Sequence, residues 1–146
     1  MHYDYYHLNA WVTEIYGRKE FTIFAAPREE CFYPVPEETW MSGVENAFDP
    51  DYEKYPLFRE VVTSKVVLEP GDTIFVPNGT WHSARSLDVT LSIAFDQLTE
   101  QNMSSFVSDV FTRRKARRPV VGAALAAYLT GLGAALSVKE RLLDGK

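Results

Sequence analysis

Two side chains that commonly bind metal ions stand one residue apart near the start of the chain: His2 and Asp4. Side chains on a β-strand alternate between its two faces, so this pair points the same way and can hold one ion together. A third ligand has to come from another strand, and the remaining histidines are His7 and His82. His7 is an odd number of residues from both ligands and faces away on a regular strand. We therefore predict a metal site formed by His2, Asp4 and His82.

The sequence around His82 supports this prediction. Gly71, Pro77, Gly79 and His82 follow the pattern G-x5-P-x-G-x2-H, which matches the second sequence motif of the cupin barrels. In that motif a strand, a turn and a second strand bring a histidine to the mouth of the barrel. The motif ends on an asparagine where this chain has Ser86. Together with the HYD pair, the segment resembles the JmjC-type cupins, which are Fe(II)- and 2-oxoglutarate-dependent oxygenases.

Other segments between residues 2 and 96 carry the same resemblance. GRKEFTIFAAP resembles the family's G-x-K segment, and CFYPVPE and FDPDYEKYPLF resemble a loop of its asparaginyl hydroxylase branch. WHSARSLDVTLSIAF resembles the last strands of the barrel. The resemblance implies a double-stranded β-helix, the cupin or jelly-roll barrel. It also implies the C-terminal part of a longer oxygenase, because the family's upstream strands do not precede His2.

The resemblance further implies how the site works, with no catalytic residue beyond the metal ligands. Two imidazoles and one carboxylate leave three octahedral positions of Fe(II) for a bidentate 2-oxo acid and dioxygen. Lys19 stands where the family has a lysine for the distal carboxylate of 2-oxoglutarate, a role suited to a compact positive charge. Arg85 is the alternative carboxylate partner, or else forms a surface salt bridge. Asn9 is a further cofactor-site candidate, and with Thr80 and Ser83 a candidate for hydrogen bonds that orient the imidazoles.

Most of the elements that must position these residues are β-strands. Residues 9–25 are rich in aromatic and β-branched residues and predict two strands with a tight turn at Gly17. Residues 26–58 are rich in proline and have no sustained period, which predicts a long ordered loop or insert. From residue 61 to 95, short β runs are separated by the turn sequences EPGD and PNGT. We therefore predict a mostly β barrel portion over residues 1–98.

A C-terminal α-helical extension is predicted over residues 99–146. Its first apolar residues fall on one helix face, with Asn102 as the N-cap. The basic run RRKARR (113–118) precedes twenty uncharged residues, 119–138. They are long enough to cross a membrane, yet they are rich in alanine and contain glycines that weaken a helix, so we do not expect a membrane partner. Two short buried helices explain the segment equally well, and the resemblance suggests a homodimer through the C-terminal helices.

Composition and charge limit the compartment and the partners. The 146 residues, 46% of them apolar, suffice for one sizeable core. The single cysteine, Cys31, cannot form an internal disulfide, and the first residues do not resemble a secretion signal, so we expect a cytoplasmic protein. Residues 1–110 carry 7 Lys/Arg against 18 Asp/Glu, whereas residues 111–146 carry 8 against 2. An acidic body lacks the clustered positive charge that nucleic acid requires, and we expect no nucleic-acid partner.

We therefore expect a dioxygenase that uses Fe(II) and 2-oxoglutarate to hydroxylate a C–H bond. The resemblance to the asparaginyl hydroxylase loop favours a protein side chain as its substrate over a small molecule. Two other classes stay open. One is a cupin-like module that binds or dimerises without oxidising. The other is a membrane-tethered or dimer-forming scaffold in which the C-terminal segment is the working part.

Overall fold

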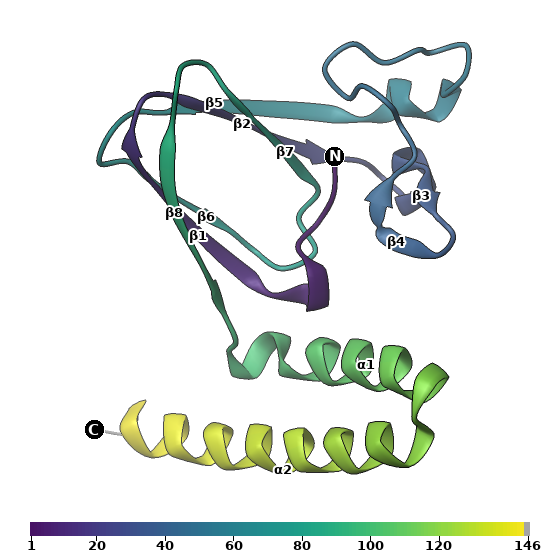
Figure 1. Cartoon of the computed structure of the whole chain (residues 1–146), viewed down its shortest axis with the longest axis vertical. Coiled ribbons are helices and arrows are strands. Elements are labelled where there is room, and N and C mark those ends of the chain that lie inside the picture. Colours follow the sequence, from purple (N-terminus) through teal and green to yellow (C-terminus); the bar gives the residue numbers. More distant parts are fainter. Residues whose placement is uncertain (145–146) are drawn as a thin grey trace.

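Two three-stranded antiparallel sheets face each other above a pair of helices (Figure 1). The computed structural model describes residues 1–144, with the side chains of 115–117, 140, 143 and 144 outside the description. One sheet has the strand order β6 (Thr73–Val76), β1 (Asn9–Tyr16), β8 (Leu91–Gln97), and the other has β5 (Val62–Leu68), β2 (Lys19–Ala25), β7 (His82–Ser86). The helices are α1 (Glu100–Arg117) and α2 (Pro119–Asp144). The prediction of a mostly β body followed by a helical part is confirmed.

The chain passes from one sheet to the other at its tight connections. β1 leads into β2 through Gly17 and Arg18, and these two strands lie in different sheets. The two strands predicted over residues 9–25 are confirmed, but their turn is a corner between sheets and the strands do not pair. The connections from β5 to β6, from β6 to β7 and from β7 to β8 cross in the same way. A double-stranded β-helix winds like this, and that finer assignment stays a prediction.

A buried apolar cluster fills the space between the two sheets. Ala10 lies opposite Val76 in the β1 sheet, and Phe21 lies opposite Ala84 in the β2 sheet. The cluster consists of Ala10, Phe21, Leu68 and Val76, with Val12 and Ile74 packed against it. Because side chains alternate along a strand, His82, two residues before Ala84, faces this same inner space.

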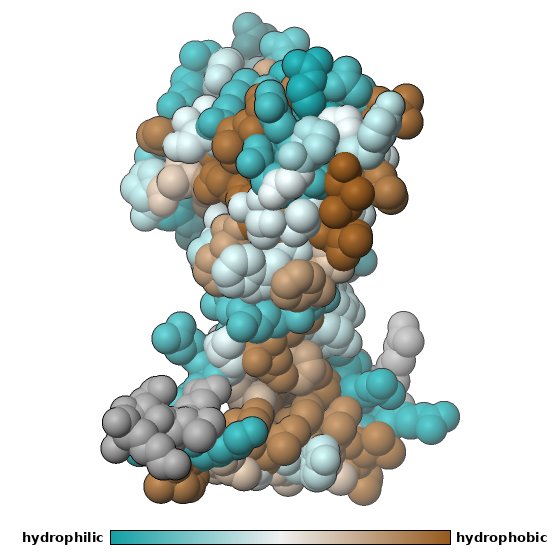
Figure 2. All heavy atoms as spheres, turned by 90° about the vertical axis from the view of Figure 1, so that its left-hand side faces the viewer, coloured by the Kyte–Doolittle hydropathy of each residue, from teal (hydrophilic) through white to brown (hydrophobic). Residues whose placement is uncertain are grey.

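The outer face of the β1 sheet carries apolar side chains at the surface (Figure 2). The Trp11 ring lies 4.6 Å from that of Phe75 and 6.4 Å from that of Phe95, measured between centroids. Phe75 is 42% exposed and Phe95 is 56% exposed. Trp11 thus belongs to an outward-facing aromatic row, one strand position away from the inner space.

An ordered insert connects β2 to β5 and packs beside the β2 sheet (Figure 1). It contains the short helices η2 (Glu29–Phe32) and η3 (Pro56–Glu60) and a two-stranded sheet of β3 (Pro34–Val35) and β4 (Glu38–Ser42). A second buried cluster joins this insert to the N-terminal segment and to the residue before β7; it consists of Tyr3, Phe24, Phe32, Val44, Tyr55, Phe58 and Trp81.

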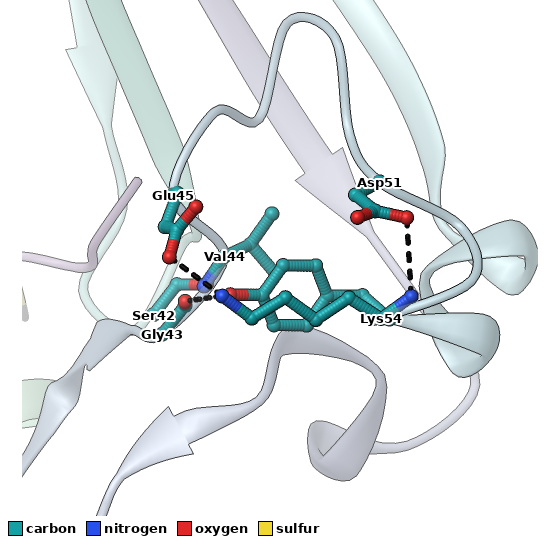
Figure 3. A network of polar contacts seen from close by, with 7 residues as sticks. Ser42, Gly43, Val44, Glu45, Asp51 and Lys54 are labelled. Carbon is teal, nitrogen blue, oxygen red and sulfur yellow. Dashed lines mark hydrogen bonds and ion pairs between the residues drawn. The ribbon is translucent and has the colours of Figure 1, made fainter.

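Polar contacts tie together the two ends of the loop between β4 and η3 (Figure 3). The Lys54 ammonium group lies 2.6 Å from Glu45 Oε1, and the Lys54 backbone N–H donates to Asp51 Oδ1 at 3.1 Å. The Tyr55 hydroxyl donates to the Gly43 carbonyl oxygen at 2.8 Å. The prediction of an ordered insert over residues 26–58 is confirmed.

The first helix begins with a capping box rather than with the predicted N-cap. Thr99 is the N-cap of α1 and Asn102 is the third helical residue. Asn102 Oδ1 accepts from the Thr99 backbone N–H at 2.7 Å, and its Nδ2 donates to the carbonyl oxygens of His7 and Gln97. The prediction for Asn102 is therefore wrong by one turn, because this fully buried side chain serves both the helix start and the segment before β1.

The second helix is continuous and mostly exposed. The alternative of two short buried helices over residues 119–138 is wrong, because the helix runs through Gly131 and Gly133 without a break. Gly133 lies where α2 approaches α1, since a Cβ placed there would meet Met103 Cγ at 2.7 Å. By length and composition alone, Pro119–Lys139 could cross a membrane: its mean hydropathy is 1.7, and 11% of its most apolar window is buried. It is the one such helix in the described part of the chain.

Gly17 permits the corner between β1 and β2. Its φ of 75° lies in the left-handed region that favours glycine. A Cβ placed there would lie 2.2 Å from the carbonyl oxygen of Val89, in the loop between β7 and β8. Arg18, the next residue, pairs with Asp88 of the same loop at 2.8 Å. The corner therefore needs glycine both for its backbone conformation and for the close approach of this loop.

Replacing Gly17 by alanine tests the close approach. Gly71→Ala is the matched control, because Gly71 has a φ of 98° but nothing within 4 Å of a built Cβ. We expect Gly71→Ala to lower the free energy of unfolding by about 1 kcal/mol and Gly17→Ala by about 2 kcal/mol more, owing to the clash with Val89. Urea unfolding measures both. Equal losses for the two variants would contradict the clash.

Candidate metal centre

The N-terminal segment is held between two strands and is not a free end. The His2 backbone N–H donates to the His82 carbonyl oxygen at 3.0 Å, and the His82 N–H donates to the His2 carbonyl oxygen at 2.8 Å. On its other side, the Tyr3 N–H donates to the Trp40 carbonyl oxygen of β4 at 3.0 Å. These bonds give residues near a terminus the fixed position that a ligand set requires.

The three predicted ligands meet at this bridge. The ligand atoms of His2, Asp4 and His82 all lie within 4.8 Å of one another. Asp4 Oδ1 lies 3.9 Å from His2 Nε2 and 3.8 Å from His82 Nε2. The two imidazole rings are 4.6 Å apart between centroids. The side chains thus converge on a space that suits one ion.

The turn before β7 sets the orientation of His82. His82 Nδ1 lies 2.9 Å from the carbonyl oxygen of Thr80, which makes Nδ1–H the donor and leaves Nε2 facing Asp4. Thr80 thus orients the imidazole through its main chain. Asn9 holds the same turn, because its Oδ1 accepts from the Asn78 N–H at 2.9 Å. Ser83 follows His82 directly and, by alternation, lies on the other face of β7.

Burial controls the charges of the ligands. The pKa of His2 is lowered to about 4, first by burial and then by repulsion from His82 and the N-terminal ammonium group. Its imidazole is therefore neutral near pH 7, the form that binds a metal. Burial raises the pKa of Asp4; His82 opposes this effect and Asp96 adds to it.

One carboxylate oxygen at the site has no partner. Asp4 Oδ2 is buried and has no hydrogen bond among the described residues. A buried oxygen of this kind carries a desolvation cost that a bound cation relieves. Two imidazole nitrogens and one carboxylate also form the donor set of facial iron sites. The residues therefore fit a divalent transition-metal ion.

Comparison with known proteins identifies the family. The family described as Cupin-like domain matches residues 1–103. The chain belongs to this cupin-like, JmjC-type family.

Curated relatives match only part of their own length. HSPB1-associated protein 1 of Bos taurus is 34% identical over 116 residues, which are 77% of this chain and 24% of that protein. Lysine-specific demethylase 8 of Xenopus tropicalis is 30% identical over 58% of this chain and 19% of its own length. Arginine-specific demethylase JMJ20 of Arabidopsis thaliana is 28% identical over 71% of this chain and 22% of its own length. The cupin-like chain thus spans about a quarter or less of these relatives.

Lys19 enters the inner space of the cupin-like body beside a buried carboxylate. Its Nζ contacts the Ser92 hydroxyl and lies 3.8 Å from Glu14 Oε2, while that hydroxyl donates to Glu14 Oε2 at 2.8 Å. Lys19 lies opposite Ser86, four residues beyond His82 on β7, which is about 13 Å along the strand. Lys19, the predicted anchor for the co-substrate, thus faces the same inner space as His82. Its positive charge is already paired in part with the Glu14 carboxylate.

Arg85 lies on the opposite side of the cupin-like sheet. It stands three residues after His82, so its side chain leaves the other face of β7. Its Nε lies 3.0 Å from Glu20 Oε1, and its guanidinium lies 5.0 Å from the Phe48 ring centroid. The structure does not bring Arg85 to the site, and of its two predicted roles it has the salt bridge.

His7 does not join the proposed ligands, but the regular strand assumed in predicting this is absent. Its Nδ1 lies 2.8 Å from Asp109 Oδ2 of α1. It ends the short helix η1 (Tyr5–His7), which follows Asp4 directly, and both Tyr6 and His7 have positive φ values. Helix α1 therefore fixes the segment between Asp4 and β1.

Sequence reasoning missed the acidic residues near the site. Glu14 lies on the same face of β1 as Ala10 and Val12, so strand alternation alone was a signal that this charge faces inward. Asp96 lies opposite Ala10 on β8, and Asp109 reaches His7 from α1. These two depend on sheet register and on helix docking, for which the local sequence gives no signal.

Proposed function

We propose that this chain binds Fe(II) through His2, Asp4 and His82 and uses 2-oxoglutarate to hydroxylate a C–H bond of a protein side chain. The observation that carries the proposal is the convergence of the three ligand atoms within 4.8 Å, around a carboxylate oxygen that lacks a hydrogen-bond partner. Membership in the JmjC-type cupin-like family supports it. Two relatives are named as lysine- and arginine-specific demethylases, which supports a protein side chain as the substrate.

The chain's own residues have separate tasks in this proposal. His2 supplies a neutral imidazole and Asp4 a negative charge, and the bond from His82 Nδ1 to Thr80 keeps Nε2 free for the ion. Three protein ligands would leave further coordination positions of a bound Fe(II) for the co-substrate. Lys19 supplies a positive charge for the distal carboxylate of the co-substrate. When bound, Fe(II) and 2-oxoglutarate supply the oxidising chemistry.

Removing the Asp4 carboxylate tests the metal site. We expect Asp4→Ala to weaken Fe(II) binding by about 100-fold or more, because the ion loses its only anionic ligand. Anaerobic titration measures binding, and a visible charge-transfer band that needs both Fe(II) and 2-oxoglutarate reports a competent site. The control is Asp96→Ala, which removes a nearby inward carboxylate and is expected to keep the band.

Two results would contradict this proposal. Unchanged Fe(II) binding in Asp4→Ala would show that Asp4 is not a metal ligand. A folded wild-type chain that binds Fe(II) but forms no succinate from 2-oxoglutarate would instead favour the non-catalytic cupin-like module.

Glu14 limits the strength with which Lys19 holds 2-oxoglutarate. Glu14 is fully buried and its carboxylate would lie close to that of the co-substrate, where like charges repel. We expect Glu14→Gln to tighten 2-oxoglutarate binding roughly tenfold. Glu20→Gln is the control and is expected to leave 2-oxoglutarate binding unchanged, because Glu20 lies on β2 and pairs with Arg85 on the outer face of its sheet.

The role of Lys19 is measured in the Glu14→Gln background. Lys19→Met alone would leave Glu14 buried without its cation, which destabilises the fold by several kcal/mol. In the double variant this cost is absent, and we expect 2-oxoglutarate binding to be lost while Fe(II) binding remains. Calorimetric titration of both ligands measures this. Retained 2-oxoglutarate binding would show that Lys19 is not the anchor.

A second candidate function is self-association through α2. The helix face turned away from α1 exposes apolar side chains, among them Tyr128 at 66% and Leu142 at 70%, and Figure 2 shows apolar side chains along the helices. An apolar stripe on one face of a helix can pair with its own copy around a two-fold axis.

Tyr128→Glu tests this association. We expect the chain to sediment as a dimer in detergent-free buffer and the variant as a monomer, because a carboxylate would be buried in the interface. Thr130→Glu, on another face of the same helix, is the control and is expected to stay dimeric. A monomeric wild-type chain that binds lipid vesicles would favour the membrane-tethered alternative.

A further inference from the structure

A basic pocket lies at the segment that follows the proposed metal ligand Asp4. It is lined by Tyr5, Tyr6, Arg113, Arg114 and Arg118 and has a volume of about 730 Å³, which is in the range of ligand pockets. The two tyrosines follow the metal ligand Asp4 in the chain, and the arginines come from the end of α1 and the residue after it. In Figure 1 the segment before β1 lies above α1.

Arg113 is fixed on the tyrosines without losing its hydrogen-bonding edge. Its guanidinium carbon lies 3.9 Å from the Tyr5 ring centroid and 5.8 Å from that of Tyr6. Stacking of this kind orients the guanidinium plane and leaves its N–H groups free at the rim. The acidic residue one turn earlier, Asp109, is 2.8 Å from His7 and is thus already engaged. The charge of Arg113 is therefore available to a ligand.

Arg114 and Arg118 add positive charge that the described side chains do not neutralise. Arg118 is the C-cap of α1, and its backbone N–H donates to the Arg114 carbonyl oxygen at 2.7 Å, so both residues lie at the end of this helix. Neither forms an ion pair with a carboxylate among the side chains that the structure describes. Three guanidinium groups around one pocket are the arrangement that binds carboxylates through paired N–H donors.

Aromatic side chains connect this pocket to the metal ligands. The Tyr5 ring lies 5.4 Å from that of Trp40, and Trp40 lies 6.3 Å from the His2 ring. A second cavity of about 330 Å³ adjoins, and Tyr6 and Arg113 line both cavities. A chain anchored among the arginines can thus extend over Tyr6 to Trp40, the residue whose ring contacts that of His2.

We propose that this pocket binds an acidic side chain of a peptide and so positions a neighbouring residue of that peptide at the metal centre. The positioning role rests on the proposed function, whereas the binding does not. A short peptide fits better than nucleic acid, because Glu37 and Asp109 line the adjoining cavity and the body of the chain is acidic. These charges repel an extended polyanion but leave room for a single carboxylate between the arginines.

Fluorescence anisotropy with the metal-free chain tests the binding. The probe is a fluorescein-labelled twelve-residue peptide of glycine and serine with one asparagine and one glutamate, and its partner probe has glutamine in place of that glutamate. We expect the acidic peptide to bind at least about tenfold more tightly than the neutral one. The double variant Arg114→Gln/Arg118→Gln is expected to abolish that difference, because it removes two of the three positive charges of the pocket. It leaves in place Arg113, which stacks on the tyrosines.

Arg141→Gln is the matched control, because it removes an exposed arginine of α2 that pairs with Glu100 at 3.8 Å, outside the pocket. It is expected to leave peptide binding unchanged. Equal affinity for the two peptides, or an equal effect of the control, would overturn the inference. So would tighter binding of a twelve-nucleotide RNA or of phosphatidylserine vesicles that is lost in the same double variant.

Turnover separates this inference from the proposed function. If the wild-type chain binds the acidic peptide through its arginines but forms no succinate with Fe(II), the proposed function is overturned and the binding site is kept. Succinate formation in a chain that does not prefer the acidic peptide would overturn the binding site and keep the proposed function.

Discussion

The reciprocal backbone hydrogen bonds between His2 and His82 are the contact on which the rest of the site depends. They join two segments eighty residues apart in the chain and bring the imidazoles to 4.6 Å between ring centroids. Each later feature rests on this pairing. Asp4 follows His2 closely enough to share its side of the bridge, and Trp40 closes the other edge by accepting the Tyr3 N–H. The main-chain hydrogen bonds therefore determine where the proposed ligands lie, and the side chains supply the atoms that would bind the ion.

The inner space between the sheets combines apolar packing with uncompensated polarity. Ala10, Phe21, Leu68 and Val76 stabilise it, while the unpartnered oxygen of Asp4 and the buried Glu14 carry desolvation costs. Replacing such groups by apolar residues of similar size would often stabilise a fold. Local violations of good packing are expected at functional sites. The concentration of these violations along one inner face, next to His82 and Lys19, supports reading that face as the working side of the body.

Local pattern in the sequence predicted most of the strands and the three side chains that converge, but not which elements pair or dock with one another. His2 and Asp4 do converge and His7 does point away, but the reason is not strand alternation, because Tyr5–His7 forms the short helix η1 with positive φ values at Tyr6 and His7. Strand alternation could have placed Arg85 on the face opposite His82, where it pairs with Glu20. What local pattern could not give is long-range: β1 and β2 go to different sheets, and Asn102 serves a segment ninety-five residues before it. Register and docking arise from tertiary packing, which overrides local preference.

The helical extension is part of the site's support. The positive φ values of Tyr6 and His7 cost free energy, and such strain persists only where surrounding contacts hold it. Here both contacts come from α1: Asp109 pairs with the His7 ring, and Asn102 donates to the His7 carbonyl oxygen. The same helix carries Arg113 to the Tyr5 ring, one residue after Asp4. These contacts connect α1 to the segment that follows the proposed ligand Asp4, so a displacement of α1 would also move that segment.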